Sequence, residues 1–209
     1  MQILNHLSAE PDSKQTYARM GFKPGWSEIP PNMKELVKEA IQTGRSLLTP
    51  LACFTHLPIQ RLDHDSIELS NDFTIRSRKV AQWMMGCMGI YLAAVTIGSK
   101  LDARVAELSE KGEITKAFLL NAYGAEAAEA LMGELSKEIT RLTKEQNFAT
   151  TKRYSPGYGD WDISAQLSLL EIVQAQEIGI RLTEQYMMIP EKSVSAIIGV
   201  KPNDAMGEE

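Results

Sequence analysis

The sequence predicts a single α+β domain, and three observations lead to that prediction. The chain has 209 residues, near the common size of one domain, with 44% hydrophobic and 23% charged residues, as in ordinary globular proteins. Two almost continuously apolar runs, 90–97 and 193–200, are typical of buried strands, and segments with helical periodicity lie between them. No internal repeat or low-complexity linker divides the chain.

The first helix is predicted just after Pro31. Asn32 would act as its N-cap, and Gly44 would end it. Apolar residues recur along this segment at helical spacing and form one stripe, made of Met33, Leu36, Val37, Ala40 and Ile41.

The stretch 51–75 lacks helical periodicity, and within it residues 67–69 and 73–75 are predicted as short strands. Residues 77–86 then form a predicted helix. The strand 90–97 follows, and its continuous apolar character indicates that both of its faces are covered.

The middle of the chain is predicted to be helical. One helix follows Ser99 and ends near Gly112, with its apolar positions at Leu101, Val105 and Leu108. A longer helical region covers 113–144, and its apolar face is formed by Ala128, Leu131, Leu135, Ile139 and Leu142. Gly124 and Gly133 lie inside this region, and glycine weakens a helix interior. These residues therefore leave open whether the region is one unbroken helix.

The last third is predicted as an extended segment over 148–154, a loop over 156–161 and an amphipathic helix over 163–177. Gly179 would close that helix, and its inward positions would be Leu167, Leu170 and Val173. The second buried strand, 193–200, comes last.

Composition excludes several classes of protein. The chain has 22 basic and 27 acidic residues, a net charge of −5, which argues against a nucleic-acid partner. The apolar stretch Val80–Ser99 is interrupted by glycines, so no membrane partner is expected, and the N-terminus lacks the basic start of a signal peptide. The two cysteines, Cys53 and Cys87, are too few for a four-thiolate iron–sulfur cluster and fit a reducing cytosol. A cytoplasmic protein is expected.

The most unusual stretch is Arg153–Trp161, which carries one guanidinium, two glycines, a proline and three aromatic rings. An arginine can hold a carboxylate by two parallel hydrogen bonds, and Gly157 lets the backbone approach a ligand closely or adopt a positive φ. Flat surfaces for a ring or a cation are offered by Tyr154, Tyr158 and Trp161. From composition alone, a binding loop and a tight turn whose aromatics fill the core both remain open.

Other polar groups are less informative. Glu126 and Glu129 lie on one face of the predicted long helix, and Glu129 adjoins the apolar stripe, which would leave it half buried. We expect no metal site, because zinc-site spacing is lacking in the loose set of Cys53, His56, Asp63, His64 and Asp65. The sequence also lacks the phosphate-binding glycine motifs and the serine hydrolase motif.

Three stretches, in order, resemble the activation domain of cobalamin-dependent methionine synthase, in particular its freestanding single-domain form. They are Ala94–Gly98, the pattern Arg153-x-x-x-Gly157-Tyr158 extended by Gly-Asp-Trp, and Leu182–Pro190 followed by Ser193–Ser195. The resemblance covers roughly residues 80–200.

The resemblance implies a twisted, mainly antiparallel sheet with packed helices. Residues 76–201 would form the activation-domain-like core, residues 1–75 a divergent N-terminal segment of the same domain, and residues 202–209 a frayed tail.

A site for S-adenosylmethionine is also implied by the resemblance. Arg153 would hold the carboxylate of the methionyl group, and Ser155, Pro156 and Gly157 would provide the backbone that lies beside the ligand. Tyr158 would flank the sulfonium or face the corrin, and it is the one catalytic residue expected.

Acidic contacts complete the implied site. Glu129 would meet the α-ammonium of the ligand, because a buried ammonium needs a carboxylate partner. The family also uses an aspartate from its N-terminal segment, and the candidates here are Asp63, Asp65 and Asp72.

The partners follow from the same resemblance. The sequence lacks the Asp-x-His-x-x-Gly pattern of a cobalamin module, so cobalamin would arrive on a separate, corrinoid-carrying methionine synthase core, with an electron-donor protein as a second partner. The implied function is a standalone reactivation subunit that binds S-adenosylmethionine and supports reductive methylation of Co(II)alamin. Two alternatives stay open: a sensor or scaffold module without catalysis, and an activator of a different corrinoid methyltransferase.

Overall fold

The computed structural model describes residues 1–22 and 29–203. Its centre is a seven-stranded sheet in which six strands have the order β4-β3-β2-β5-β9-β6. The seventh strand, β1, pairs with residues 52–54 of β2, while β3 pairs with residues 59–62 of β2. Every pairing in this sheet is antiparallel. The strands are β1 (Gln2–Leu4), β2 (Leu51–Leu62), β3 (Ser66–Leu69), β4 (Thr74–Arg76), β5 (Gly89–Thr96), β6 (Phe148–Thr150) and β9 (Ser193–Pro202). The prediction of a single mixed domain with an antiparallel sheet is confirmed.

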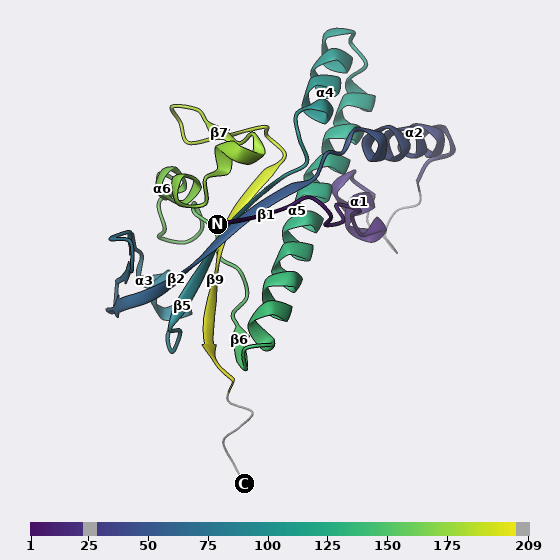
Figure 1. The fold of residues 1–209 in the computed structure, drawn as a ribbon. Helices are drawn as coiled ribbons and strands as arrows, with labels where there is room; N and C mark the ends of the chain where they lie inside the picture. Colours follow the sequence, from purple (N-terminus) through teal and green to yellow (C-terminus); the bar gives the residue numbers. More distant parts are fainter. Residues whose placement is uncertain (23–28, 204–209) are drawn as a thin grey trace.

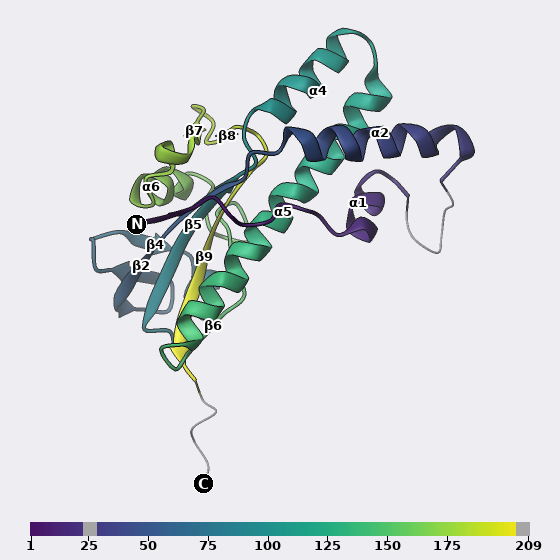
Figure 2. The ribbon, with the colours of Figure 1, turned by 45° about the vertical axis from the view of Figure 1, so that its right-hand side comes forward.

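Helices cover both faces of the sheet (Figures 1 and 2). One face packs against the long helix α5 (Ile114–Lys144), which also contacts α1 (Ser13–Arg19), α2 (Pro31–Leu47) and α4 (Lys100–Glu110). The other face is covered by α3 (Arg78–Trp83), α6 (Ala165–Ile172) and the 3₁₀ turn η1 (Ala175–Ile178). A separate hairpin joins β7 (Arg181–Leu182) to β8 (Met188–Ile189).

Strand β5 shows why its sequence is apolar throughout. Ala93 and Val95 belong to the core beside α5, whereas Leu92 and Ala94 belong to the core on the opposite face. Because successive side chains alternate between faces, a strand buried on both sides needs apolar residues at every position. The two predicted buried strands are confirmed as β5 and β9.

The N-terminal segment contributes a long strand that the sequence did not reveal. β2 spans Leu51–Leu62 and pairs with β5 along Leu51–Pro58, so it joins residues 1–75 to the central sheet. Its second half alternates between partly buried and exposed positions and contains Pro58, which disguises it as a series of short pieces. The predicted short strands are confirmed as β3 and β4. The boundary proposed at residue 75 remains a prediction.

Helix α2 differs from the prediction at both ends. Its N-cap is Pro30, and Asn32 lies inside the first turn, where it cannot act as the cap. Gly44 does not end the helix, which continues to Leu47. A β-carbon on Gly44 would lie 2.2 Å from Cδ1 of Tyr123 on α5, so this glycine allows two helices to approach closely.

Helix α5 is one unbroken helix through both of its glycines. Gly124 is required by packing, because a β-carbon there would lie 2.5 Å from Leu101 on α4. The predicted helix 163–177 is instead divided into α6 and η1 by Gln174, whose φ is 52°. Leu167 is 46% exposed, which contradicts its predicted inward position, whereas Leu170 and Val173 are buried.

The helix predicted over 77–86 is shorter than expected. The Ser77 side chain caps α3, which ends at Trp83. The strand β6 covers only the start of the predicted extended segment 148–154. Residues 204–209 of the predicted tail lie outside the described residues, and residues 201 and 202 still belong to β9.

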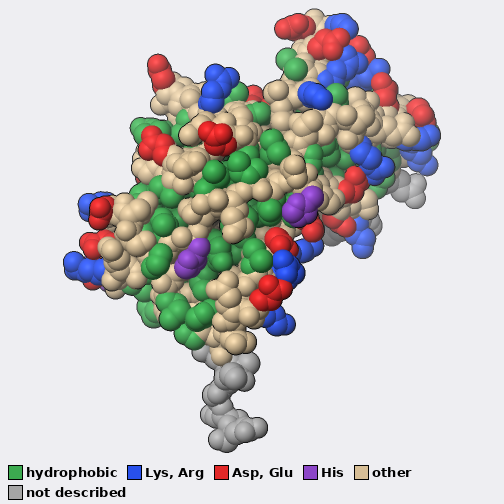
Figure 3. Space-filling view, in the orientation of Figure 1, with side chains coloured by type: hydrophobic (Ala, Val, Ile, Leu, Met, Phe, Trp, Pro, Cys, Tyr) green, Lys and Arg blue, Asp and Glu red, His purple; other side chains and the backbone are tan. Residues whose placement is uncertain are grey.

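Charged side chains of both signs are mixed around the end of the α4–α5 pair (Figure 3). There Glu107 pairs with Arg104 at 2.6 Å and with Lys111 at 2.5 Å. Within the described residues, no helix combines the length and apolarity that crossing a membrane requires.

Candidate functional site

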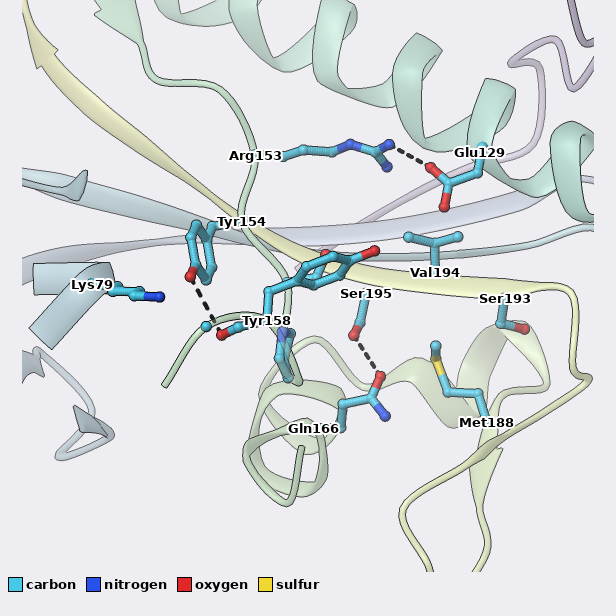
Figure 4. Close-up of a pocket in the computed structure, with 13 residues that line it drawn as sticks. Lys79, Glu129, Arg153, Tyr154, Tyr158, Gln166, Met188, Ser193, Val194 and Ser195 are labelled. Atoms are coloured by element: carbon cyan, nitrogen blue, oxygen red, sulfur yellow. Dashed lines mark hydrogen bonds and ion pairs between the residues drawn. The ribbon is translucent and has the colours of Figure 1, made fainter. Parts of the chain in front are cut away.

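A cavity of about 500 Å³ opens between the loop 153–161, the start of β9, α5 and α6. This volume lies within the range of about 300–1,000 Å³ that is usual for small-molecule sites. Figure 4 shows the lining side chains converging from these elements. The lining residues are Lys79, Glu129, Arg153, Tyr154, Ser155, Pro156, Tyr158, Gly159, Gln166, Met188, Ser193, Val194 and Ser195.

The loop 153–161 is fixed to the sheet at its start. Tyr154 exchanges two backbone hydrogen bonds with Ile197 of β9, at 2.9 and 2.8 Å. The loop then turns at Gly157, whose φ is 86° and whose N–H donates to the carbonyl of Trp161 at 2.8 Å. Gly159 also has a positive φ, of 63°, and a β-carbon there would lie 2.5 Å from the Tyr154 hydroxyl. Both glycines are therefore required by the shape of the loop.

The far end of the loop is fixed to helix α3. The carboxylate of Asp160 accepts hydrogen bonds from the Ser77 hydroxyl and from the backbone N–H groups of Arg78, at 3.0 Å, and Lys79, at 3.3 Å. These donors stabilise the ionised form and lower the pKa of Asp160, with the Ser77 hydroxyl as the largest cause. Trp161 is 2% exposed and anchors the loop in the core. The interpretation as a core-filling turn therefore holds for Trp161, whereas the first part of the loop lines the cavity.

Arg153 and Glu129 form an ion pair on one wall of the cavity. Glu129 comes from α5 and Arg153 from the segment after β6, and Figure 4 shows the two side chains pointing toward each other. The side chain of Arg153 remains 33% exposed and that of Glu129 39% exposed. The guanidinium has five N–H donors, and the structure commits only one nitrogen of it, Nη2, to Glu129. The wall therefore offers both a cation and an anion to a ligand.

Tyr158 lies at the mouth of the cavity. Its side chain is a large exposed aromatic, at 67%, and its ring extends across the cavity toward β9 in Figure 4. The carbonyl oxygen of Tyr158 accepts a hydrogen bond from the Tyr154 hydroxyl at 3.3 Å. This contact holds the backbone at the mouth while leaving the ring of Tyr158 accessible.

The structure brings most of the expected site residues together. Glu129, Arg153, Ser155, Pro156 and Tyr158 all line the cavity. Gly157 does not line it; its positive φ shapes the turn, and Gly159 takes the cavity-lining position.

None of the candidate N-terminal aspartates lies at the cavity. Asp63 pairs with Arg61 at 2.8 Å, Asp65 lies 3.4 Å from His64, and Asp72 occupies a turn with φ of 62°. No group of three or more potential metal-ligating side chains of His, Cys, Asp or Glu occurs in residues 1–22 and 29–203.

Four polar lining residues were missed by sequence reasoning: Lys79, Gln166, Ser193 and Ser195. Lys79 follows the start of α3, and nothing local in the sequence connects it with the loop 153–161. Gln166 carried a signal: it occupies the first position of the buried stripe of α6, which continues at Leu169, Leu170 and Val173. A polar residue in a buried stripe needs a hydrogen-bond partner, and Gln166 finds two.

Comparison with known proteins identifies the family of this chain. The family model described as "Vitamin B12 dependent methionine synthase, activation domain" matches residues 48–206, a range that contains every residue lining the cavity. The chain belongs to this family. The resemblance to the activation domain that the sequence indicated is thus confirmed.

A solved structure supports the same fold for this activation domain. The crystal structure of the MetH reactivation domain bound to AdoHcy is 17% identical, with a TM-score of 0.72. The similarity covers 97% of this chain and 78% of that one. No curated protein matches the sequence.

Proposed function

We propose that this activation domain binds S-adenosylmethionine in the cavity and supports reductive methylation of Co(II)alamin carried by a separate methionine synthase core. The observation that carries the proposal is the partly exposed ion pair between Arg153 and Glu129 on the cavity wall. A structure of the same fold is described as bound to AdoHcy, the product that S-adenosylmethionine leaves after donating its methyl group.

The amino-acid end of the ligand is complementary to this ion pair. The ligand carboxylate would take the remaining N–H donors of Arg153, and the ligand ammonium would take the carboxylate of Glu129. Each charge of the zwitterion then meets an opposite charge, so that neither is left uncompensated on leaving water. The existing ion pair already orients both side chains, which lowers the entropy lost on binding.

The mouth of the cavity would hold the reacting group. The exposed ring of Tyr158 offers its face to the sulfonium, because an aromatic face attracts cations. Cobalamin bound to the partner would supply the metal that receives the methyl group, with one electron from an electron-donor protein, while the sulfonium leaves as the neutral thioether AdoHcy. The contribution of this chain is to hold the methyl donor in one orientation at an open mouth.

A cytoplasmic location suits this role. Both Cys53 and Cys87 are free thiols in the structure, as expected in a reducing compartment.

Methyl transfer to the cofactor tests the proposal. Co(II)alamin-loaded synthase core, a low-potential reductant and methyl-labelled S-adenosylmethionine are mixed with and without this chain. Label should reach cobalamin only when the chain is present, and Arg153→Ala should reduce the labelling. Arg61→Ala is the matched control, because Arg61 lies on β2, pairs with Asp63 and does not line the cavity.

Three outcomes would contradict the proposal. Labelling that does not depend on the chain would exclude the reactivation function. Binding of AdoHcy without any effect on labelling would instead support a sensor or scaffold module, and labelling only with another corrinoid protein would support an activator of a different methyltransferase.

A further inference from the structure

The floor of the cavity carries hydrogen bonds of fixed direction. Gln166 of α6 is 5% exposed, and its Nε2 lies 2.7 Å from the carbonyl oxygen of Tyr186. Its Oε1 lies 2.8 Å from Oγ of Ser195 on β9 (Figure 4). A carbonyl oxygen only accepts hydrogen bonds, so the atom that faces Tyr186 must be the amide nitrogen. The orientation of the Gln166 amide therefore follows from the chemistry of its partner.

That orientation determines what Ser195 offers to a ligand. Gln166 Oε1 only accepts, so the Ser195 hydroxyl donates its single hydrogen to it. Ser195 Oγ then has only lone pairs left, while Gln166 Nε2 retains one N–H. Ser193, on the same face of β9, likewise donates its hydroxyl hydrogen, to the carbonyl of Pro190 at 2.7 Å. Along this floor the serine oxygens are acceptors, and Gln166 is a donor.

We propose that Ser195 and Gln166 recognise the nucleoside end of the ligand as a donor–acceptor pair. Ser195 accepts a hydrogen bond from an N–H or O–H of the nucleoside, and Gln166 donates to a neighbouring acceptor atom. This inference rests on the proposed function, in which Arg153 and Glu129 take the amino-acid end on another wall of the same cavity.

Two parts of an adenosyl group have the required chemistry. Adenine presents its exocyclic amine as a donor beside the ring nitrogen N1 as an acceptor, and the ribose diol presents hydroxyl hydrogens beside hydroxyl oxygens. A hypoxanthine base reverses the adenine pattern, because O6 is an acceptor and N1 carries a hydrogen. Such a base would place its acceptor against Ser195, whose own hydrogen is already committed. A site that leaves buried polar groups unpaired rejects the wrong ligand strongly.

Calorimetric titration with three ligands tests the inference. The ligands are AdoHcy, its 6-oxo analogue S-inosylhomocysteine, and its 2′,3′-dideoxy analogue. The unmodified chain should prefer AdoHcy over one of the two analogues by about tenfold, equivalent to about 1.4 kcal/mol. Ser195→Ala and Gln166→Met should reduce that preference to within about threefold. If the affinity of S-inosylhomocysteine approaches that of AdoHcy in these variants, the pair recognises the base. If the affinity of the dideoxy analogue does so, the pair recognises the ribose.

The control is Ser109→Ala, because Ser109 is an exposed residue of α4 whose hydroxyl donates a hydrogen bond to the carbonyl oxygen of Val105. This variant should keep the full preference for AdoHcy. Each preference is a ratio measured within one variant, so partial unfolding of a variant lowers both affinities alike. Equal affinity of the unmodified chain for all three ligands, or unchanged ratios in Ser195→Ala, would overturn the inference. Failure of AdoHcy to bind the unmodified chain would overturn the proposed function itself.

Discussion

The Arg153–Glu129 pair is predicted to matter for binding and very little for stability. Its side chains are 33% and 39% exposed, so water screens their attraction in the free protein. Ion pairs of this kind contribute about 0.2–1 kcal/mol. Because 1 kcal/mol shifts the Tm of a chain of this size by roughly 2–4 °C, Glu129→Gln should lower the Tm by less than about 4 °C.

The effect of the same substitution on binding should be much larger. Glutamine keeps the shape of Glu129 but removes the charge that would meet the ligand ammonium. A hydrogen bond to a charged group contributes roughly 1.5–3 kcal/mol, so AdoHcy should bind about 10-fold to 150-fold more weakly. Arg153→Ala should show a loss of the same size at the ligand carboxylate, and calorimetry with thermal unfolding of each variant measures both quantities.

Glu126→Gln provides a matched control on the same helix. Glu126 pairs with Arg19 of α1, its side chain is only 15% exposed, and it does not line the cavity. This variant should leave AdoHcy affinity unchanged and lower the Tm at least as much as Glu129→Gln. A Tm loss of more than about 8 °C in Glu129→Gln, with unchanged affinity, would refute the reasoning and make the pair a structural one.

Two further predictions concern the core. Gly44→Ala should destabilise the protein by about 1–3 kcal/mol in an unfolding assay, because the new methyl group would lie 2.2 Å from the Tyr123 ring. Gly133→Ala is the control: no atom lies within 4 Å of its β-carbon, so the variant should be neutral or stabilised by up to about 1 kcal/mol. Equal changes in the free energy of unfolding for the two variants would contradict this account. Burial raises the pKa of Cys53 from 9.0 to about 12, so the unfolded thiol ionises first and the free energy of unfolding should fall as pH rises from about 9 to 12. Cys53→Ala should show a shallower decline over that pH range, and an identical slope would contradict the assignment.

The local sequence pattern was sufficient to predict those elements whose packing environment restricts the residue types along the element itself. The strands 90–97 and 193–200 were predictable because burial on both faces demands apolar residues throughout. Strand β2 was not, because its outer half alternates and contains Pro58. Gly44 was misinterpreted as a helix end for a different reason: its partner, Tyr123, lies far away in the sequence.

The candidate site shows the same division. The loop 153–161 was recognisable from its unusual composition, and its arginine and tyrosine do line a cavity. Lys79 was not recognisable as a site residue, because it reaches the cavity from a separate element, α3. Gln166 carried only the signal of a polar residue within a buried helical stripe. The role expected of Gly157 also changed, since only the fold shows that its φ shapes the turn while Gly159 lines the cavity.

The amino-acid sequence alone therefore determined the fold class, the buried strands and the family, since these depend on the order and spacing of residue types along the chain. Tertiary structure alone decided that Glu129 meets Arg153, that Asp160 anchors the loop to α3, and that Gln166 orients Ser195. Each of these contacts joins residues from different elements. Their distances and hydrogen-bond directions arise only when the helices and the sheet have packed together.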